Sequence, residues 1–301
     1  MKGVFDARAG SRYDDDIETR YHFPERYLDE VRKMVGDWIV YRSTRRGGGQ
    51  IAYFAAARVV RVDPDPADPK HYYARVEDYL AFDELVPLER PTGFYERKLE
   101  FVPKTSFGVA FQGRAARVIS EVEFGDIVRA GLKETLDPAN AVRLELDPQH
   151  ADEATRQLIV APEEEQERRV VQILTNRKIR DASFRRKVCD AYENRCAVTG
   201  LRMINGGGKA EAQAAHIWSV EDGGPDVVQN GLALSATVHW LFDRHLISLT
   251  DEYGLLVSHN RVPSELQSLF QSQLTQIRLP KNEALRPRLR YIQRHRAAFV
   301  G

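Results

Sequence analysis

The chain has 301 residues, which is enough for two domains of about 150 residues each. Hydrophobic residues make up 43% of the sequence and charged residues 29%, as in an ordinary soluble globular protein. The 44 basic and 44 acidic residues give a formal net charge of zero. This balance excludes a polybasic coat for non-specific nucleic-acid binding, but it leaves room for local basic faces.

The N-terminal half is predicted to consist mostly of strands. It contains one helical pattern, at 26–35, and three strand-like runs, at 37–41, 51–62 and 71–74. The glycines at 47–49 indicate a turn. The proline-rich run at 63–69 ends a strand, because proline cannot donate to a strand ladder. We therefore expect a small, curved, mostly antiparallel sheet with one or two helices.

Two helices are predicted near the middle of the chain. Residues 163–180 have acidic side chains near the start and basic ones later, which suits the helix dipole. Ser183 is the expected N-cap of a second helix. The apolar side chains of that helix recur on one face: Phe184, Val188, Ala191 and Tyr192.

The zero net charge hides a segregation along the chain. Residues 120–165 contain twelve acids and four bases, whereas residues 168–187 contain eight bases and one acid. Residues 263–301 contain seven bases and two acids. The asymmetry predicts a C-terminal half that faces a polyanion. The stretches 168–187 and 278–296 are expected to hold the backbone of the nucleic acid. The alternative is that these are solvated helix faces that happen to be basic.

Cysteine usage and hydropathy indicate a cytoplasmic protein. Cys189 and Cys196 are the only cysteines, so neither a disulfide scaffold nor a CxxC…CxxC zinc ribbon is expected. No apolar run approaches the roughly 18 residues of a membrane span. The segment after Lys2 has no apolar core, so we expect no signal peptide and no membrane partner.

Three polar residues stand out between 213 and 243. His216 lies in a short strand-like run, Asn230 in the sequence Asn-Gly-Leu-Ala-Leu, and His239 in a helical pattern that starts near Ser235. Their spacings are 230 − 216 = 14 and 239 − 216 = 23 residues. A strand, loop, strand and helix would bring the three side chains together at one end of the motif.

This ordered set resembles the HNH endonuclease family, whose fold is the ββα-metal motif. The sequences Cys-Ala-Val-Thr-Gly at 196–200 and His-Trp-Leu-Phe-Asp at 239–243 reinforce the resemblance, which covers about residues 180–260. The resemblance implies that His216 is the general base, since imidazole titrates near working pH. It implies that Asn230 hydrogen-bonds the loop and fixes the base, and that His239 is a metal ligand.

The metal set expected from this resemblance is short. Asp243 lies one helical turn after His239, so it shares a face with it and is a candidate second ligand or a partner of Arg244. Mg²⁺ or Mn²⁺ suits such ligands together with phosphate oxygens. HNH sites often carry a carboxylate or histidine just before the base, but Ala215 stands there. This departure leaves open a degenerate, non-catalytic site.

The N-terminal region, about residues 10–130, resembles the EVE branch of the PUA-like superfamily in its runs at 36–41 and 52–59. The resemblance implies recognition of a modified base that is flipped out and stacked in an aromatic pocket. The candidate residues of this pocket are Trp38, Tyr21, Tyr53, Tyr13 and Asp37. The bland alternative is that strand aromatics form the core.

Together these features predict an α+β protein. An EVE/PUA-like curved β-barrel domain (1–150) is followed by a basic helical linker (151–180) and a ββα-metal HNH domain with flanking helices and a basic tail (181–301). The predicted function is that of an endonuclease cutting double-stranded DNA that carries 5-methylcytosine or 5-hydroxymethylcytosine. Cutting both strands predicts a homodimer. The alternatives are an HNH endonuclease that reads unmodified DNA, and a non-catalytic nucleic-acid-binding protein.

Overall fold

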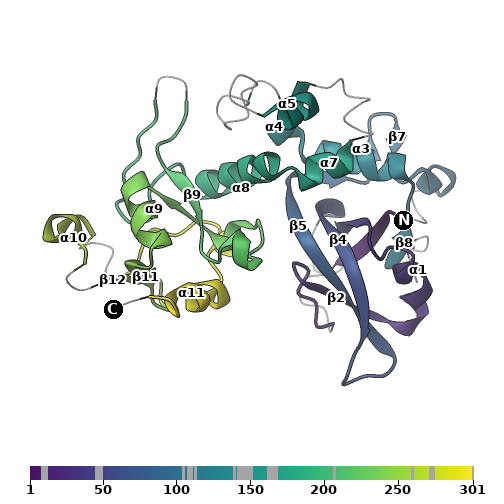
Figure 1. The fold of residues 1–301 in the computed structure, drawn as a ribbon. Coiled ribbons are helices and arrows are strands. Elements are labelled where there is room, and N and C mark those ends of the chain that lie inside the picture. Colours follow the sequence, from purple (N-terminus) through teal and green to yellow (C-terminus); the bar gives the residue numbers. More distant parts are fainter. Residues whose placement is uncertain are drawn as a thin grey trace. The chain divides into compact units, whose positions relative to one another are not determined.

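The computed structural model describes residues 1–7, 13–44, 50–103, 106, 111, 114–137, 140, 152–160, 169–205, 208–258, 261–270 and 275–299. The chain divides into two compact units, Met1–Asn140 with Pro148–Ile179, and Ala141–Asp147 with Arg180–Gly301. The division at 179/180 falls inside helix α8 (Arg177–Ala191), labelled in Figure 1. The glycine turn expected at 47–49 and the helix start expected at 163 lie outside the described residues.

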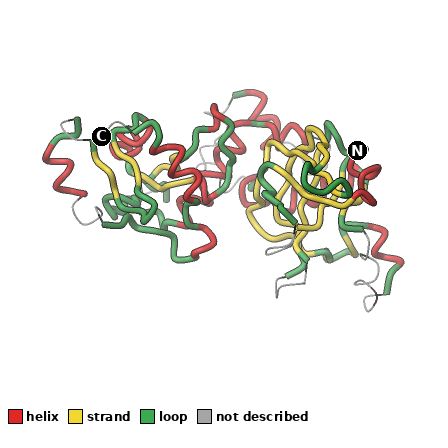
Figure 2. Tube along the Cα trace, turned by 90° about the horizontal axis from the view of Figure 1, so that it is seen from below, coloured by secondary structure: helices red, strands yellow, loops and turns green. Residues whose placement is uncertain are grey.

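The first unit is built on a six-stranded sheet of order β2-β5-β4-β3-β1-β8. Its strands are β1 (Gly3–Ala7), β2 (Arg20–Pro24), β3 (Trp38–Ser43), β4 (Ala52–Pro64), β5 (His71–Pro87) and β8 (Ala116–Val118). The β1–β3 pair is parallel and the other four pairs are antiparallel. Figure 2 shows these strands curling around a shared interior. The expected curved, mostly antiparallel sheet is confirmed as a half-barrel, whereas a PUA-like barrel stays a prediction.

Short helices and one small hairpin complete the first unit. They are η1 (Glu25–Tyr27), α1 (Leu28–Arg32), β6 (Glu89–Arg90), β7 (Gly93–Phe94), η2 (Arg97–Phe101), α3 (Glu121–Gly131), α4 (Lys133–Leu136), α5 (Glu153–Val160) and α7 (Val170–Thr175). Helix α3 packs against β3, β4 and β5. It begins with a capping box, in which Ser120 Oγ accepts from Glu123 N at 3.2 Å and Glu123 Oε2 accepts from Ser120 N at 2.7 Å.

The second of the two predicted helices begins at a different residue from the one expected. Asn176 Oδ1 accepts from Ile179 N at 3.1 Å, so Asn176 caps the start of α8. Ser183 lies fully buried within α8, and the prediction that it starts a helix is wrong. The Asn176 amide lies just ahead of the first turn of α8 and satisfies one of its unpaired backbone N–H groups, so α8 begins at Arg177, directly after this residue.

The second unit contains the predicted strand–loop–strand–helix order. Strand β9 (Gln213–His216) pairs antiparallel with β10 (Gly231–Leu234), and His216 stands opposite Gly231. Helix α9 (Ala236–Asp243) follows β10 and lies against β9 (Figure 1). The remaining elements are η5 (Val220–Asp222), η6 (Val228–Asn230), β11 (Ile247–Leu249), β12 (Leu255–Val257), α10 (Ser264–Phe270), η8 (Glu283–Leu285) and α11 (Leu289–Arg296). None of the helices in the described parts is long and apolar enough to span a membrane.

The apolar face expected on α8 packs against β10. Phe184, Val188 and Tyr192 are all at most 5% exposed, as the spacing predicted. Gly231 is where the strand meets this helix, because a Cβ added there would lie 2.4 Å from Val188 Cγ2 and 3.0 Å from Phe184 Cζ. The absence of a side chain at 231 therefore sets how closely β10 approaches α8.

We expect Gly231→Ala to lower the free energy of unfolding by about 1–3 kcal/mol, because the new methyl overlaps Val188. Val188→Ala in the same chain makes room for it. The double variant should therefore be more stable than the sum of the two single effects, by about 0.5 kcal/mol or more in urea unfolding. Strict additivity of the two substitutions would contradict the close approach.

A buried histidine joins α11 to the end of α9. His295 is 6% exposed, its Nε2 donates to Phe242 O at 3.0 Å, and its Nδ1 accepts from Ser248 Oγ at 3.0 Å. Its ring also stacks on Phe242, with centroids 3.8 Å apart. Burial lowers the pKa of His295 to about 4, more than the bond to Phe242 O raises it, and the nearby His245 lowers it further. The folded protein therefore holds His295 in its neutral form.

Stability should consequently fall between about pH 6.5 and about pH 4. In this window the unfolded chain binds a proton on His295, whereas the folded chain does not. The free energy of unfolding therefore falls by up to about 3 kcal/mol as the pH drops. Urea unfolding at about pH 7 and about pH 5 should show a smaller loss for His295→Gln than for the wild type. His71→Gln is the matched control, and an equal loss in all three proteins would refute the assignment.

Candidate functional site

His216 ends strand β9 with its imidazole held on two sides. Its Nε2 donates to Asp226 Oδ1 at 3.0 Å, and its ring stacks on Phe184 with centroids 3.8 Å apart and planes 9° apart. Since an ionised carboxylate only accepts hydrogen bonds, this contact places a proton on Nε2. The side chain is 17% exposed, so one part of the ring reaches solvent.

The partner of this histidine is a buried carboxylate. The Asp226 side chain is 1% exposed, and its Oδ2 accepts from Arg180 Nε at 2.9 Å and Arg180 Nη2 at 2.7 Å. No role was predicted for Asp226 from the sequence, and Arg180 was expected among the bases that face a polyanion. Arg180 is in fact 8% exposed and pairs inside the unit. The available signal was an acidic residue lying between Pro225 and the apolar pair Val227 and Val228.

Asn230 ties together the loop that separates the two strands. Its side chain is fully buried; Oδ1 accepts from Trp218 N at 2.9 Å, and Nδ2 donates to Trp218 O at 2.9 Å and to Pro225 O at 3.0 Å. Gly224 lets the loop close, because a Cβ there would lie 2.0 Å from Trp218 O. Asn230 thus hydrogen-bonds both sides of the loop that carries Asp226, and its part in any reaction stays a prediction.

His239 lies on α9 with one ring nitrogen directed to each side of the site. Its Nδ1 donates to Gln213 Oε1 at 2.9 Å, and its Nε2 lies 3.4 Å from Asp243 Oδ2. Gln213 therefore fixes the ring from strand β9, and Nε2 faces Asp243. The Asp243 side chain is 52% exposed and open to solvent.

This pair fits a divalent cation as two protein ligands. His239 Nε2 and Asp243 Oδ2 lie 3.4 Å apart, close enough to ligate one ion together, and a hydrogen bond on the other ring nitrogen is typical of ligating histidines. Mg²⁺ is commonly held by one or two protein ligands together with water and phosphate oxygens. Ala215 is fully buried opposite Leu232 and offers no ligand. Among the described residues no cluster of three or more His, Cys, Asp or Glu side chains suits a metal.

The structure brings the three predicted residues onto one hairpin and its helix. Asn230 directly precedes β10, whose Gly231 pairs with His216, and His239 is bonded to the same strand through Gln213. Their catalytic and ligand roles stay predictions. Cys189 and Cys196 are free buried thiols, and burial raises the pKa of Cys189 to about 11, which makes it a poor nucleophile.

The predicted base-pocket residues of the first unit divide by burial. Trp38, Tyr21 and Tyr53 are at most 4% exposed and belong to the core of the half-barrel. Asp37 is 25% exposed and pairs with Lys2 and with the N-terminal ammonium group. Tyr13 is half-buried. The base-binding role of all five stays a prediction.

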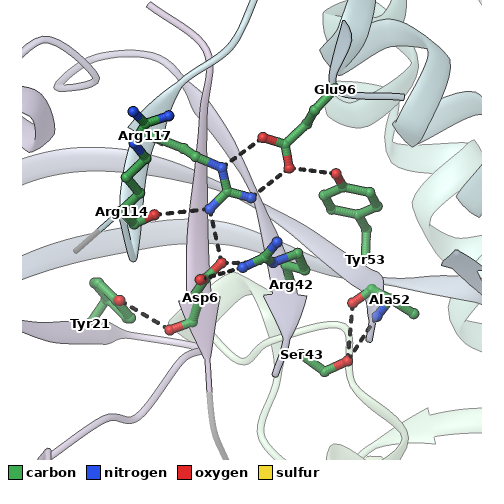
Figure 3. Close-up of polar contacts among 9 residues, drawn as sticks. All are labelled: Asp6, Tyr21, Arg42, Ser43, Ala52, Tyr53, Glu96, Arg114 and Arg117. Carbon is green, nitrogen blue, oxygen red and sulfur yellow. Dashed lines mark hydrogen bonds and ion pairs between the residues drawn. The ribbon is translucent and has the colours of Figure 1, made fainter. Parts of the chain in front are cut away.

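Figure 3 shows that the hydroxyls of Tyr53 and Tyr21 are engaged in a buried polar network. Tyr53 donates to Glu96 Oε1 at 2.6 Å, and Tyr21 donates to Asp6 O at 3.0 Å. Arg117 joins the two acids, with Nε donating to Glu96 Oε2 at 2.6 Å and Nη1 to Asp6 Oδ1 at 3.0 Å. The network links β1, β4, β8 and the segment before η2 inside the sheet.

Opposite charges keep this network ionised. Burial alone would raise the pKa of Glu96, but the attraction and hydrogen bonds of Arg117 outweigh it and lower that pKa. Arg42 adds a second guanidinium, which donates from Nε to Asp6 Oδ1 at 2.9 Å and lies over the Phe111 ring at 3.6 Å. Two buried arginines therefore offset two buried carboxylates.

Tyr13 belongs to a separate aromatic group with His22 of β2 and Tyr73 of β5. Its ring meets His22 edge-on at 5.6 Å, and His22 stacks on Tyr73 at 4.6 Å. Asp14 beside them is 60% exposed, and hydrogen bonding to Arg20 lowers its pKa. The side chains of this group are partly exposed to solvent, whereas those of Trp38 and Tyr53 are buried.

Comparison with known proteins identifies one part of the chain. Three solved structures resemble it with low similarity: a "Modification dependent TagI restriction endonuclease" (14% identity, 99% of this chain and 82% of that one, TM-score 0.34), Rpa0253 from Rhodopseudomonas palustris (14%, 43% and 92%, 0.30) and the Type IV phosphorothioation-dependent restriction endonuclease ScoMcrA (16%, 90% and 52%, 0.21). No curated protein matches the chain. Residues 196–250, which hold His216, Asn230 and His239, match the HNH endonuclease family and form an HNH endonuclease domain.

Proposed function

We propose that the protein is a metal-dependent DNA endonuclease in which His216 is the general base and His239 and Asp243 hold one divalent cation. The observation that carries the proposal is that two histidines within the residues that match the HNH family each have one ring nitrogen bonded to a neighbouring side chain. His216 has Nε2 bonded to Asp226, and His239 has Nδ1 bonded to Gln213. Each histidine thus keeps one nitrogen for chemistry while the other is held by the protein.

Hydrolysis of a phosphodiester needs an activated water and a stabilised leaving oxygen. Nδ1 of His216 takes a proton from water, the new bond between oxygen and phosphorus forms, and the bond to the leaving oxygen breaks. A bound Mg²⁺ or Mn²⁺ supplies Lewis-acid stabilisation of the developing charge. Asn230 acts in this scheme by holding the loop that bears Asp226.

The first unit is proposed to supply specificity by binding a modified cytosine flipped from the duplex. Phosphate contacts position a nuclease on DNA without selecting sequence, so a separate reader is needed for selectivity. The half-buried Tyr13 supports this proposal best, since aromatic rings stack on flipped bases and its group is accessible. Cleavage of both strands further leads us to propose a homodimer.

We expect His216→Ala to lower the rate of DNA cleavage with Mg²⁺ or Mn²⁺ by about 100-fold or more, because the general base is lost. Binding of the same DNA, measured by gel shift, should be unchanged. His239→Ala should instead move the metal dependence to about 10- to 100-fold higher concentration. EDTA should stop cleavage by the wild type.

Cleavage that persists in His216→Ala would remove that residue as the base. Binding without cleavage by the wild type, with either metal, would favour a non-catalytic nucleic-acid-binding protein. In that case the buried Ala215, which supplies no ligand, is the residue to replace first with aspartate.

The reader is tested with one plasmid in unmodified, 5-methylcytosine and 5-hydroxymethylcytosine forms. We expect cleavage of a modified form only, and we expect Tyr13→Ala to weaken binding of that form by about 10-fold or more through lost stacking. Tyr13→Phe is the matched control, since it keeps the ring. Equal cleavage of all three forms would leave the nuclease in place and contradict modified-base reading.

A further inference from the structure

Asp226 offers its two carboxylate oxygens to two different partners. Oδ1 accepts from His216 Nε2 at 3.0 Å, while Oδ2 accepts from both Arg180 Nε at 2.9 Å and Arg180 Nη2 at 2.7 Å. The carboxylate is 1% exposed and the arginine side chain 9% exposed. The three groups come from α8, the loop before η6, and the end of β9.

We propose that Arg180 and Asp226 are positioning residues that set which nitrogen of His216 carries its proton. This inference rests on the proposed role of His216 as general base. Arg180 holds Asp226 as an oriented acceptor, Asp226 keeps the proton of His216 on Nε2, and Nδ1 is left to take a proton from water. Phe184 restricts rotation of the ring by stacking on its face at 3.8 Å.

The same contact serves the charged form of the base. When Nδ1 accepts a proton from the attacking water, the imidazole becomes a cation whose Nε2–H still points at the carboxylate. Neither Asp226 nor Arg180 gains or loses a proton in this step. The oxygen–phosphorus bond that forms replaces the bond to the leaving oxygen, which takes its proton from solvent. Asp226 therefore orients the neutral base and stabilises its charged product.

Because Arg180 fixes the orientation of residue 226, replacing one carboxylate oxygen of Asp226 by an NH₂ group tests this arrangement. In Asp226→Asn the side chain has one oxygen and one NH₂ group. The two N–H donors of Arg180 demand the oxygen, so the NH₂ group is directed at His216 Nε2. An NH₂ group can only donate there, which forces the His216 proton onto Nδ1 and blocks the base.

We expect Asp226→Asn to lower the cleavage rate by about 100-fold or more. Adding Arg180→Gln should recover about 10-fold or more of that loss, because the glutamine oxygen accepts from the NH₂ group of the new asparagine and lets its oxygen face His216. Arg180→Gln alone should lose less than Asp226→Asn, since the carboxylate remains. Asp251→Asn, which removes a carboxylate bonded to Arg296 at 2.7 Å, is the matched control.

The tautomer is measured directly, without any cleavage, by the ¹⁵N shifts of the His216 ring in the resting protein. The wild type should show Nε2 protonated and Nδ1 unprotonated, Asp226→Asn the reverse, and the double variant the wild-type pattern. These readings separate the two ideas. A wild type that shows the expected tautomer but cuts no DNA overturns the proposed function alone.

Two results would overturn the positioning role. One is a wild-type His216 with its proton on Nδ1, a reading that needs no variant to fold. The other is a double variant as inactive as Asp226→Asn although its melting temperature matches that of the wild type. A purely structural role of Asp226 predicts no rescue, because replacing Arg180 then removes a second buried partner.

Discussion

A carboxylate withdrawn from water must find donors, and Asp226 finds them in two elements that are far apart in the sequence. Its burial would be costly without compensation. Arg180 from helix α8 supplies two N–H groups and His216 from strand β9 supplies one. The requirement to satisfy this one group therefore fixes α8, the loop and β9 against each other. Breaking either contact would leave a buried charge with part of its compensation missing.

The loop that carries Asp226 is held just as firmly. The fully buried Asn230 amide bonds the backbone of Trp218 and Pro225, and Gly224 permits an approach that no side chain could share. Rigid placement of a carboxylate by a loop is possible only when the loop's own polar groups are satisfied. In this unit the Asn230 side-chain amide does so where a strand ladder is lacking, and this holds Asp226 in place beside His216.

The first unit also contains buried charged side chains that must be compensated, and there are more of them. The side chains of Asp6, Glu96, Arg42 and Arg117 lie together and are at most 12% exposed, and the tyrosine hydroxyls of the core donate to Glu96 and to the Asp6 carbonyl (Figure 3). Such networks constrain the packing around them, although Arg42 Nη1 finds no hydrogen-bond partner among the described residues. Here they occupy the hydroxyls of Tyr21 and Tyr53, and this occupation makes the accessible Tyr13 the strongest of the predicted base-stacking residues.

The order His216, Asn230, His239 and the helix start at Ser235 were determined by the sequence alone, because local periodicity and turn residues specify a strand, a loop and a helix. Strands β3 and β4 and the start of β5 followed from the same local signals, whereas β1, β2 and β8 were not predicted. The burial and pairing of Asp226 and Arg180 were decided by the tertiary structure. An acid in a turn and a base in a basic stretch look solvated until the packing of α8 removes both from water. Strand aromatics such as Trp38 likewise suit a core or a pocket equally, and only the curl of the sheet placed them inside. Long-range pairing and burial depend on how elements pack, and no spacing along one chain encodes that directly.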